Sequence, residues 1–326
     1  MAKIAVIIVN YGTAMLALEG VSSVLTRAHR GHEVSVHLVD NASPGGDAAL
    51  IRQEIKARGW QGRLTFHAEA ENHGFGRGNN LVLNTLSAAP MTPDYVFLLN
   101  PDAVLENETL EILADFLEAH PQAGAAGAEI RKPGEPEPVT AAFRFPGLAS
   151  TFAAAINFGP ITRLFDRWRV ALPIPKQSSE VDWVAGAAVM ARFAAWREVD
   201  FFDPDYFLYY EEVDLMRRCC LAGWQTWYVP EARALHTEGE ATGVKSGQST
   251  RRRHPAYLYA SWRMYFVKNH GRLYALAAAI LWLLGGAVGS TIAALRGRAS
   301  AMPLHYGRDI FGKVILPLLS SRPAAP

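Results

Sequence analysis

The most constraining feature of the sequence is a continuous apolar run at residues 95–99 that stops abruptly at Asn100, Pro101 and Asp102. A run of this length and composition is typical of a strand that is buried on both faces, as in a parallel sheet. Ligands of open α/β sheets bind outside the carboxyl ends of the strands, so we expect a ligand or a metal ion at Asp102. The alternative is a plain turn in which Asp102 caps a helix that begins near Glu106.

Two earlier runs that we predict to be strands also end in polar side chains: the apolar residues 4–9 and the partly polar residues 33–39. A helical pattern follows each run, at residues 13–28 and 47–58, and a short strand is predicted at residues 64–67. Strands that alternate with helices favour a doubly wound, mostly parallel sheet. Such a sheet brings its polar strand ends to one edge, and these ends are Asn10-Tyr11, Asp40-Asn41 and Asn100-Pro101-Asp102.

A glycine-rich stretch, residues 71–80, is predicted to be a turn that leads into a helix ending near Ser87. Glycines allow the backbone to approach a ligand, and the N-terminus of the next helix favours an anion. Together with the polar strand ends, the stretch describes a nucleotide crevice. Its position and spacing differ from those of the dinucleotide-binding fingerprint, so the stretch taken alone is better explained as an ordinary turn.

The composition sets the class of protein. With 326 residues, half of them hydrophobic, the chain can form one large α/β domain or two unequal ones. The net charge of +1 gives no indication of nucleic-acid binding. Cys219 and Cys220 are adjacent and cannot form an ordinary disulfide, and the N-terminus runs directly into a strand instead of a signal peptide. We therefore expect the catalytic part in the cytosol.

Three carboxylates, Glu211, Glu212 and Asp214, begin a predicted helix at residues 211–222, directly after a run of aromatic residues. Acidic residues in a first helical turn often only complement the helix dipole. Carboxylates crowded beside apolar surface should also have raised pKa values, which suits a general base. After a predicted strand at residues 225–230 comes His236, a lone histidine of a kind that is more often structural than a ligand.

The region between these motifs is less regular. Seven prolines interrupt residues 131–176, which we interpret as an insertion that shapes the substrate site. Residues 181–190 are predicted to form one strand with a small-residue kink at Gly186. Gly186 could form the floor of a pocket, or it could serve tight backbone packing.

These motifs, in this order, resemble the family 2 glycosyltransferases, in particular the bacterial rhamnosyltransferase-type enzymes of cell-envelope polysaccharide synthesis. The resemblance covers about residues 3–270. It rests on Val9-Asn10-Tyr11, Val39-Asp40-Asn41-Ala42-Ser43, Asn72-His73-Gly74-Phe75, Leu99-Asn100-Pro101-Asp102 and Glu211-Glu212-Val213-Asp214-Leu215. It implies a GT-A fold, a nucleotide-diphospho-sugar donor and inversion at the anomeric carbon.

The resemblance also implies which residues bind the donor. Asp40, with Asn10 and Tyr11, would hold the base and the ribose. The glycine-rich stretch, residues 71–80, would border the nucleotide through Asn72, Gly74, Arg77 and Asn80.

A divalent cation, Mg²⁺ or Mn²⁺, is implied in the same way. Asp102 matches the last aspartate of the family's Asp-x-Asp motif, which binds the metal on the diphosphate. Asn100 replaces the first aspartate of that motif. His236 matches the histidine that completes the metal site in some relatives.

For catalysis, Glu212 stands where the family has its catalytic aspartate, which is a departure by one methylene. It would take a proton from an acceptor hydroxyl. Asp214 and Arg218 would orient the site or the acceptor, and Asp214 or Glu211 are the alternative bases. The residues expected to bind the acceptor are Trp183, Gly186, Glu211 and Arg218.

The chain after residue 270 has a different composition. Residues 273–295 carry no charge and are long enough to cross a bilayer, and Gly285 and Gly289 form a small-residue packing face. Residues 303–319 have the pattern of an interfacial helix. We therefore divide the chain into a glycosyltransferase domain (residues 1–270) and a membrane-associated helical segment (residues 271–326).

The mode of membrane association stays open in the sequence. Residues 273–295 could be inserted, could attach peripherally, or could pack as a soluble helix, and basic residues at both ends leave the orientation undefined. The basic run Arg251-Arg252-Arg253 is either a solvated charge run or a contact for anionic lipid or an acceptor diphosphate.

We therefore predict an inverting, metal-assisted hexosyltransferase, most simply one that moves L-rhamnose from dTDP-rhamnose to a lipid-linked or polysaccharide acceptor. We expect it at the cytoplasmic face of the bacterial inner membrane. The changes at Asn100 and Glu212 leave a catalytically inactive nucleotide-sugar-binding protein as the alternative. A sugar nucleotidyltransferase would need a basic glycine-rich loop after the first strand, and residues 10–13 are not one.

Overall fold

The computed structural model describes residues 1–237 and 252–320. Its strands are β1 (Lys3–Asn10), β2 (Glu33–Asp40), β3 (Thr65–Ala68), β4 (Tyr95–Leu99), β5 (Ala103–Leu105), β6 (Ala123–Arg131), β7 (Pro138–Val139), β8 (Ala142–Phe143), β9 (Ser179–Val181), β10 (Trp183–Val184), β11 (Ala188–Arg192) and β12 (Gln225–His236). Its helices are α1 (Ala14–Leu25), α2 (Asp47–Ala57), α3 (Gly74–Ala88), α4 (Thr109–Ala119), α5 (Leu148–Ile156), α6 (Gly159–Thr162), α7 (Phe193–Glu198), α8 (Glu211–Leu221), α9 (Ala256–His270), α10 (Arg272–Leu295), α11 (Tyr306–Ile310) and α12 (Leu316–Leu319), with short turns η1 (His29–Gly31), η2 (Arg163–Trp168) and η3 (Phe311–Ile315).

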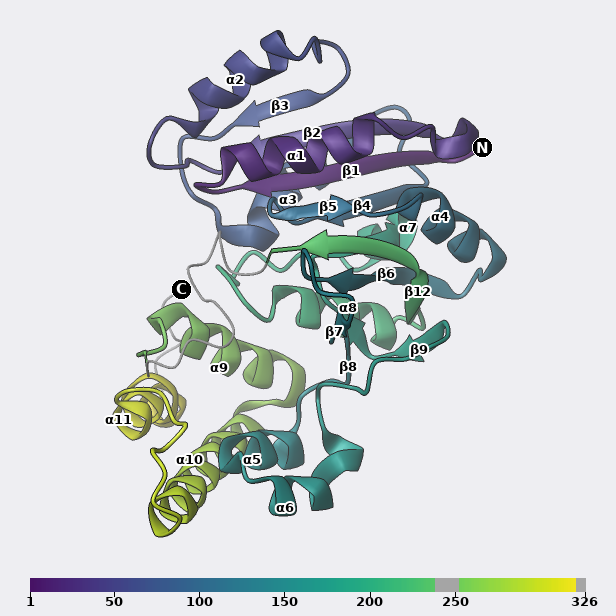
Figure 1. Cartoon of the computed structure of the whole chain (residues 1–326). Coiled ribbons are helices and arrows are strands. Elements are labelled where there is room, and N and C mark those ends of the chain that lie inside the picture. The colour runs from purple at the N-terminus through teal and green to yellow at the C-terminus, as the bar shows by residue number, and fades with distance from the viewer. Residues whose placement is uncertain (238–251, 321–326) are drawn as a thin grey trace.

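One 10-stranded sheet forms the upper part of the molecule (Figure 1). Its main path runs β3-β2-β1-β4-β11-β6-β12-β5. Strands β3, β2, β1 and β4 are parallel, and β6 and β12 are parallel. Strand β11 is antiparallel to both β4 and β6, so β4 and β6 point the same way. The sheet is therefore mostly parallel, as predicted, and the apolar runs of β1 and β4 are buried on both faces.

Strand β6 was not expected from the sequence because it consists largely of alanine and glycine. The small residues have a packing reason. A Cβ atom on Gly127 would lie 2.6 Å from Cβ of Val184, and one on Gly124 would lie 2.8 Å from Cβ of Trp224. The centre of the sheet therefore needs a strand without side-chain bulk, which a search for β-branched runs overlooks.

Three predicted elements differ in the structure. The helix expected from Glu106 begins at Thr109, because the pairing of β5 with β12 continues one residue further, where the amide of Glu106 donates to the carbonyl of Arg233 (3.0 Å). The strand expected at residues 181–190 is divided among β9, β10 and β11. The glycine-rich stretch is not a loop before a helix, because α3 already begins at Gly74.

A second core lies below the sheet, in what we call the helical lobe (residues 144–176 and 252–320). It contains buried side chains of α9, α10 and η3, and Tyr206 and Val213 reach it from the α/β part. Figure 1 shows α5, α6, α9, α10 and α11 together in this lobe. The proposed domain boundary after residue 270 stays a prediction, and the packing places α9 with the C-terminal helices.

Candidate active site

A cavity of about 630 Å³ lies where the carboxyl ends of β1 and β4 meet the start of α8. Ten of the residues singled out in the sequence line it: Tyr11, Asn72, Gly74, Asn100, Asp102, Trp183, Gly186, Glu211, Glu212 and His236. They come from segments spread over more than 200 positions of the chain. The parallel strand ends therefore do bring these motifs together.

The Asp102 and His236 side chains meet at one side of the cavity. Nε2 of His236 lies 3.0 Å from Oδ1 of Asp102 and 3.3 Å from Nδ2 of Asn100. The backbone fixes this arrangement, because β12 pairs with β5 so that His236 lies opposite Ala103. The amide of Thr237 also donates a hydrogen bond to the carbonyl of Asp102 (3.0 Å).

The chemistry of this group fits a divalent cation. Within the residues that the structure describes there is no cluster of three or more His, Cys, Asp or Glu side chains that could form a complete protein cage. Mg²⁺ and comparable ions often use only one or two protein ligands and take the rest from water and phosphate oxygens. A carboxylate and an imidazole that both face a nucleotide-sized cavity are a suitable partial set.

Glu211, which is buried, and Glu212, which is half-buried, form an acidic pair on the cavity wall. One oxygen of each carboxyl, Oε2, is buried without a hydrogen-bond partner among the residues described. Burial raises the pKa of Glu212, and burial together with the neighbouring Glu212 raises the pKa of Glu211. Each carboxyl can therefore accept a hydrogen bond from a hydroxyl placed in the cavity, and ionised Glu212 would be an effective base.

An unusual backbone conformation precedes this pair. Tyr209 and Tyr210 both have positive φ angles, of 69° and 70°. Bulky residues rarely adopt this left-handed conformation, and it is found preferentially at functional sites. Here it forms the turn through which the aromatic loop enters α8 at Glu211.

The asparagine-glycine motif holds one side of the cavity in place. Nδ2 of Asn41 donates to Oδ1 of Asn72 (3.1 Å) and to the carbonyl of Gly74 (3.0 Å). Gly74 has a φ of +75°, and a Cβ atom there would lie 1.9 Å from the carbonyl oxygen of Phe207. Only glycine fits this contact between α3 and the loop before α8. Asn41 lines the cavity too, although we did not single it out as a site residue.

Asn10 and Asp40 do not line the cavity, contrary to expectation. Both are buried, and Nδ2 of Asn10 donates to Asp40 (2.9 Å), Ser43 (3.1 Å) and Asp47 (3.0 Å). Their side chains join the ends of β1 and β2 to the start of α2. Tyr11, which follows Asn10, reaches the cavity instead.

Arg77 and Asn80 are likewise held by the protein backbone. Nε of Arg77 donates to the carbonyl of His73 (2.8 Å), the residue directly before α3. Nδ2 of Asn80 donates to the carbonyl of Phe202 (2.7 Å), and Oδ1 of Asn80 accepts from the amide of Phe202 (3.1 Å). Neither lines the cavity.

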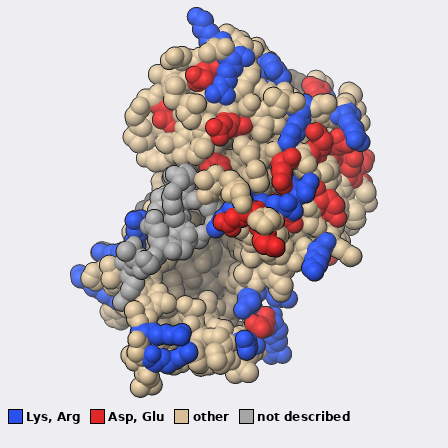
Figure 2. All heavy atoms as spheres, in the orientation of Figure 1, with Lys and Arg blue, Asp and Glu red and all other residues tan. Residues whose placement is uncertain are grey.

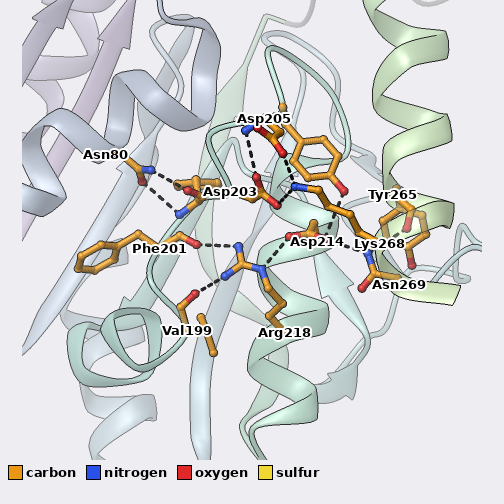
Figure 3. A network of polar contacts seen from close by, with 12 residues as sticks. Asn80, Val199, Phe201, Asp203, Asp205, Asp214, Arg218, Tyr265, Lys268 and Asn269 are labelled. Carbon is orange, nitrogen blue, oxygen red and sulfur yellow. Dashed lines mark hydrogen bonds and ion pairs between the residues drawn. The ribbon is translucent and has the colours of Figure 1, made fainter. Parts of the chain in front are cut away.

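Asp214 and Arg218 belong to a polar network behind the cavity wall (Figure 3). Nε of Arg218 donates to Asp214 (2.7 Å), and its terminal nitrogens donate to the carbonyls of Val199 and Phe201. Asp214 also accepts a bond from Asn269 of α9 (2.8 Å). The two residues hold α8, the loop before it and α9 together, so a structural role is favoured over direct contact with substrate.

Several aromatic side chains also line the cavity. Trp183 stacks on Phe143 of the 131–176 insertion, with ring centroids 4.1 Å apart. A Cβ atom on Gly186 would lie 3.7 Å from the ring of Phe75. Phe207 and Tyr257 line the cavity as well, and they were missed because isolated aromatic residues in a sequence do not distinguish a substrate wall from a core.

Comparison with known proteins decides the family. Residues 2–263 match the family model described as glycosyltransferase like family 2. The chain belongs to glycosyltransferase family 2. This glycosyltransferase is 31% identical over 219 residues to an N-acetylglucosaminyl-diphospho-decaprenol L-rhamnosyltransferase of Mycobacterium tuberculosis, covering 64% of this chain and 68% of that protein. It is 30% identical over 173 residues to rhamnosyltransferase WbbL of Escherichia coli, covering 50% of this chain and 61% of that protein.

Solved structures confirm the GT-A fold of this glycosyltransferase. The mannosyltransferase PcManGT from Pyrobaculum calidifontis, in complex with GDP-Man and Mn²⁺, matches with a TM-score of 0.56 and 16% identity over 98% of this chain and 81% of that one. TarS of S. aureus, in complex with UDP-GlcNAc, matches with a TM-score of 0.54 and 15% identity over 98% and 82% of the two chains.

Proposed function

We propose that this glycosyltransferase moves L-rhamnose from dTDP-rhamnose to a lipid-linked or polysaccharide acceptor of the cell envelope, with inversion at the anomeric carbon. The observation that carries the sugar assignment is that two relatives at about 30% identity, from different bacteria, are both rhamnosyltransferases. The acceptor assignment follows the mycobacterial relative, whose name gives a diphospho-decaprenol lipid.

The cavity supplies the residues that this reaction needs. Glu212 removes the proton from an acceptor hydroxyl, whose oxygen forms a bond to the anomeric carbon while the bond from that carbon to the diphosphate breaks. Glu211, with its unpartnered oxygen beside Glu212, orients the same hydroxyl. The Trp183–Phe143 pair offers a flat apolar surface for a sugar ring, because the C–H face of a sugar packs on aromatic rings.

Asp102 and His236 would hold Mg²⁺ or Mn²⁺ in this proposal, with Asn100 beside them. When bound, the cation neutralises negative charge on the leaving diphosphate. Tyr11, Asn72 and Gly74 border the place where the nucleotide would lie. Asp40 and Asn10 support this edge from behind, so their part in donor binding is indirect.

The test is donor hydrolysis and transfer by the purified chain, using dTDP-rhamnose, UDP-GlcNAc and GDP-mannose with Mg²⁺, Mn²⁺ or EDTA. Release of dTDP only from dTDP-rhamnose, and only with metal, is the expected result. Turnover of another donor would overturn the rhamnosyl assignment and leave the mechanism intact.

An inactive nucleotide-sugar-binding protein is the alternative that two specific residues, Asn100 and Glu212, leave open. Each replaces an aspartate of the family pattern. Binding of a donor without turnover, in the presence of a membrane lipid extract as acceptor, would support this alternative and contradict the proposed activity.

A further inference from the structure

Charge is unevenly divided between the two parts of the molecule. The helical lobe contains 14 Lys and Arg residues but only two acidic ones, Asp166 and Asp309. The rest of the chain carries 18 Lys and Arg against 29 Asp and Glu. On the face shown in Figure 2, the upper part carries both acidic and basic side chains, whereas the charged side chains of the lower lobe are mainly basic. A chain with a net charge of +1 therefore has one strongly basic end.

The same lobe exposes a long apolar surface on α10. Its large exposed side chains are Leu273, Ile280, Leu284, Val288 and Leu295. Their spacing places them on one side of the helix, along about 33 Å. Arg272 and Arg296 stand at the two ends of the helix, and no charged residue interrupts it between them.

The other side of α10 is already packed within the lobe. A Cβ atom on Gly289 would lie 2.2 Å from the carbonyl oxygen of Ile156 in α5, and one on Gly285 would lie 2.7 Å from that of Phe152. On Gly286, a Cβ atom would meet the ring of Tyr306 at 2.3 Å. The small-residue face is therefore used by short helices of the same chain.

These neighbours conflict with a membrane-spanning α10. The helices packed around it include ion pairs and polar bonds, such as Arg253 with Asp309 (2.7 Å) and Arg263 with the carbonyl of Lys313 (2.6 Å). A spanning α10 would either draw these groups into hydrocarbon, which is costly, or lose its packing. A helix with one packed side and one apolar exposed side fits the plane of a membrane interface.

We propose that the helical lobe docks on the surface of an anionic bilayer, with the exposed side of α10 in the headgroup–acyl boundary and without crossing the membrane. The exposed apolar side chains of α10 would be buried among the lipids at the interface. The surrounding Lys and Arg side chains would be attracted to the anionic headgroups. In the basic run Arg251-Arg252-Arg253, the side chain of Arg253 forms an ion pair with Asp309, and Arg251 lies outside the described residues.

Docking of this lobe would also bring the cavity to the membrane surface. Tyr257 of α9 lines the cavity, and Ser261 donates to the carbonyl of Leu208 (2.9 Å) in the loop that leads to Glu211. The lobe and the cavity wall are thus directly joined. This step rests on the proposed function, because it matters only if the acceptor is carried by a lipid.

The experiment is sedimentation of the purified full chain with vesicles of phosphatidylcholine, alone or with roughly one-third phosphatidylglycerol. We expect binding only to the anionic vesicles, weakened about tenfold when NaCl rises from roughly 0.05 to roughly 0.5 M. We also expect complete release by alkaline carbonate. Equal binding to uncharged vesicles, or retention after carbonate, would overturn the proposal.

Two variants test the surface itself. The double variant Ile280→Gln with Leu284→Gln, at positions 45% and 52% exposed, should lower vesicle affinity about tenfold or more. Leu221→Gln, at a position 74% exposed on the α/β part, is the matched control and should bind as the wild type does. Equal affinity of the double variant and the control would contradict the assignment. Donor hydrolysis without vesicles measures the proposed function separately.

Discussion

Nε2 of His236 lies 3.0 Å from Oδ1 of Asp102, although 134 positions separate the two residues. The antiparallel pairing of β5 with β12 produces this contact, because it places His236 opposite Ala103, next to Asp102. Asn100 approaches the same imidazole nitrogen at 3.3 Å. A carboxylate, an imidazole and an amide thus converge on one side of the cavity, which is the basis for the first prediction.

Loss of Asp102 or His236, the two proposed metal ligands, should weaken Mn²⁺ binding. We expect Asp102→Asn to abolish measurable Mn²⁺ binding with nucleotide present, and His236→Gln to weaken it about 10- to 100-fold. Conversely, Asn100→Asp adds a second carboxylate and should strengthen Mn²⁺ binding about tenfold. Electron paramagnetic resonance titration of free Mn²⁺ measures all three without turnover. Wild-type affinity in Asp102→Asn would place the metal elsewhere.

Glu212→Gln should remove the base but keep its size. We expect transfer to fall about 10²- to 10⁴-fold, while donor affinity stays within about threefold. Glu212→Asp shortens the side chain by one methylene and should retain more activity than the glutamine variant. Single-turnover transfer and calorimetric donor binding separate the two effects. Full transfer by Glu212→Gln would assign the base to another residue, and Glu211 is the nearest candidate.

The rate should depend on the ionisation of the Glu211–Glu212 pair. Only ionised Glu212 can accept a proton, and burial raises its pKa above the ordinary 4.5. Activity is therefore lost, as the pH falls, at a higher pH than for an exposed glutamate. Glu211→Gln should leave this acidic limb of kcat/KM in place, because burial and Glu212 raise the pKa of Glu211 further, so Glu211 still carries its proton when Glu212 ionises. The pH dependence of kcat/KM for the wild type and this variant measures both points, and a wild-type limb in the ordinary range of an exposed glutamate would contradict the prediction.

The sequence predicted most of this arrangement because the site lies at the ends of long apolar strands. The runs that became β1, β2 and β4, and the polar residues after them, follow local rules of burial and alternation. What sequence reasoning missed depends on tertiary contacts. The alanine-glycine strand β6 is defined by the bulk of Val184 and Trp224, and the amides of Asn10 and Asn80 found partners far along the chain.

The network around Asp214 should matter for stability. Its carboxylate is buried and paired with Arg218 and Asn269, so Asp214→Asn leaves the Arg218 guanidinium without its charged partner. We expect the free energy of unfolding to fall by about 2–4 kcal/mol. Asp205→Asn is the matched control, because Asp205 is an exposed carboxylate paired with Lys268. This substitution should lower the free energy of unfolding by less than about 1 kcal/mol. Urea unfolding followed by circular dichroism measures both, and equal losses would contradict a special role for Asp214.

The contact between α5 and α10 can be tested with a single methyl group. Gly289→Ala places a Cβ atom 2.2 Å from the backbone of Ile156, so the two helices must separate, and we expect a loss of about 1–3 kcal/mol in unfolding free energy. Gly312→Ala, where a Cβ atom meets nothing within 4 Å, should be neutral or slightly stabilising. The urea midpoints of the two variants give the comparison. If Gly289→Ala is also neutral, α5 does not occupy this face of α10. The face would then be open to a transmembrane partner, and the argument for an α10 that lies in the membrane plane would lose its main support.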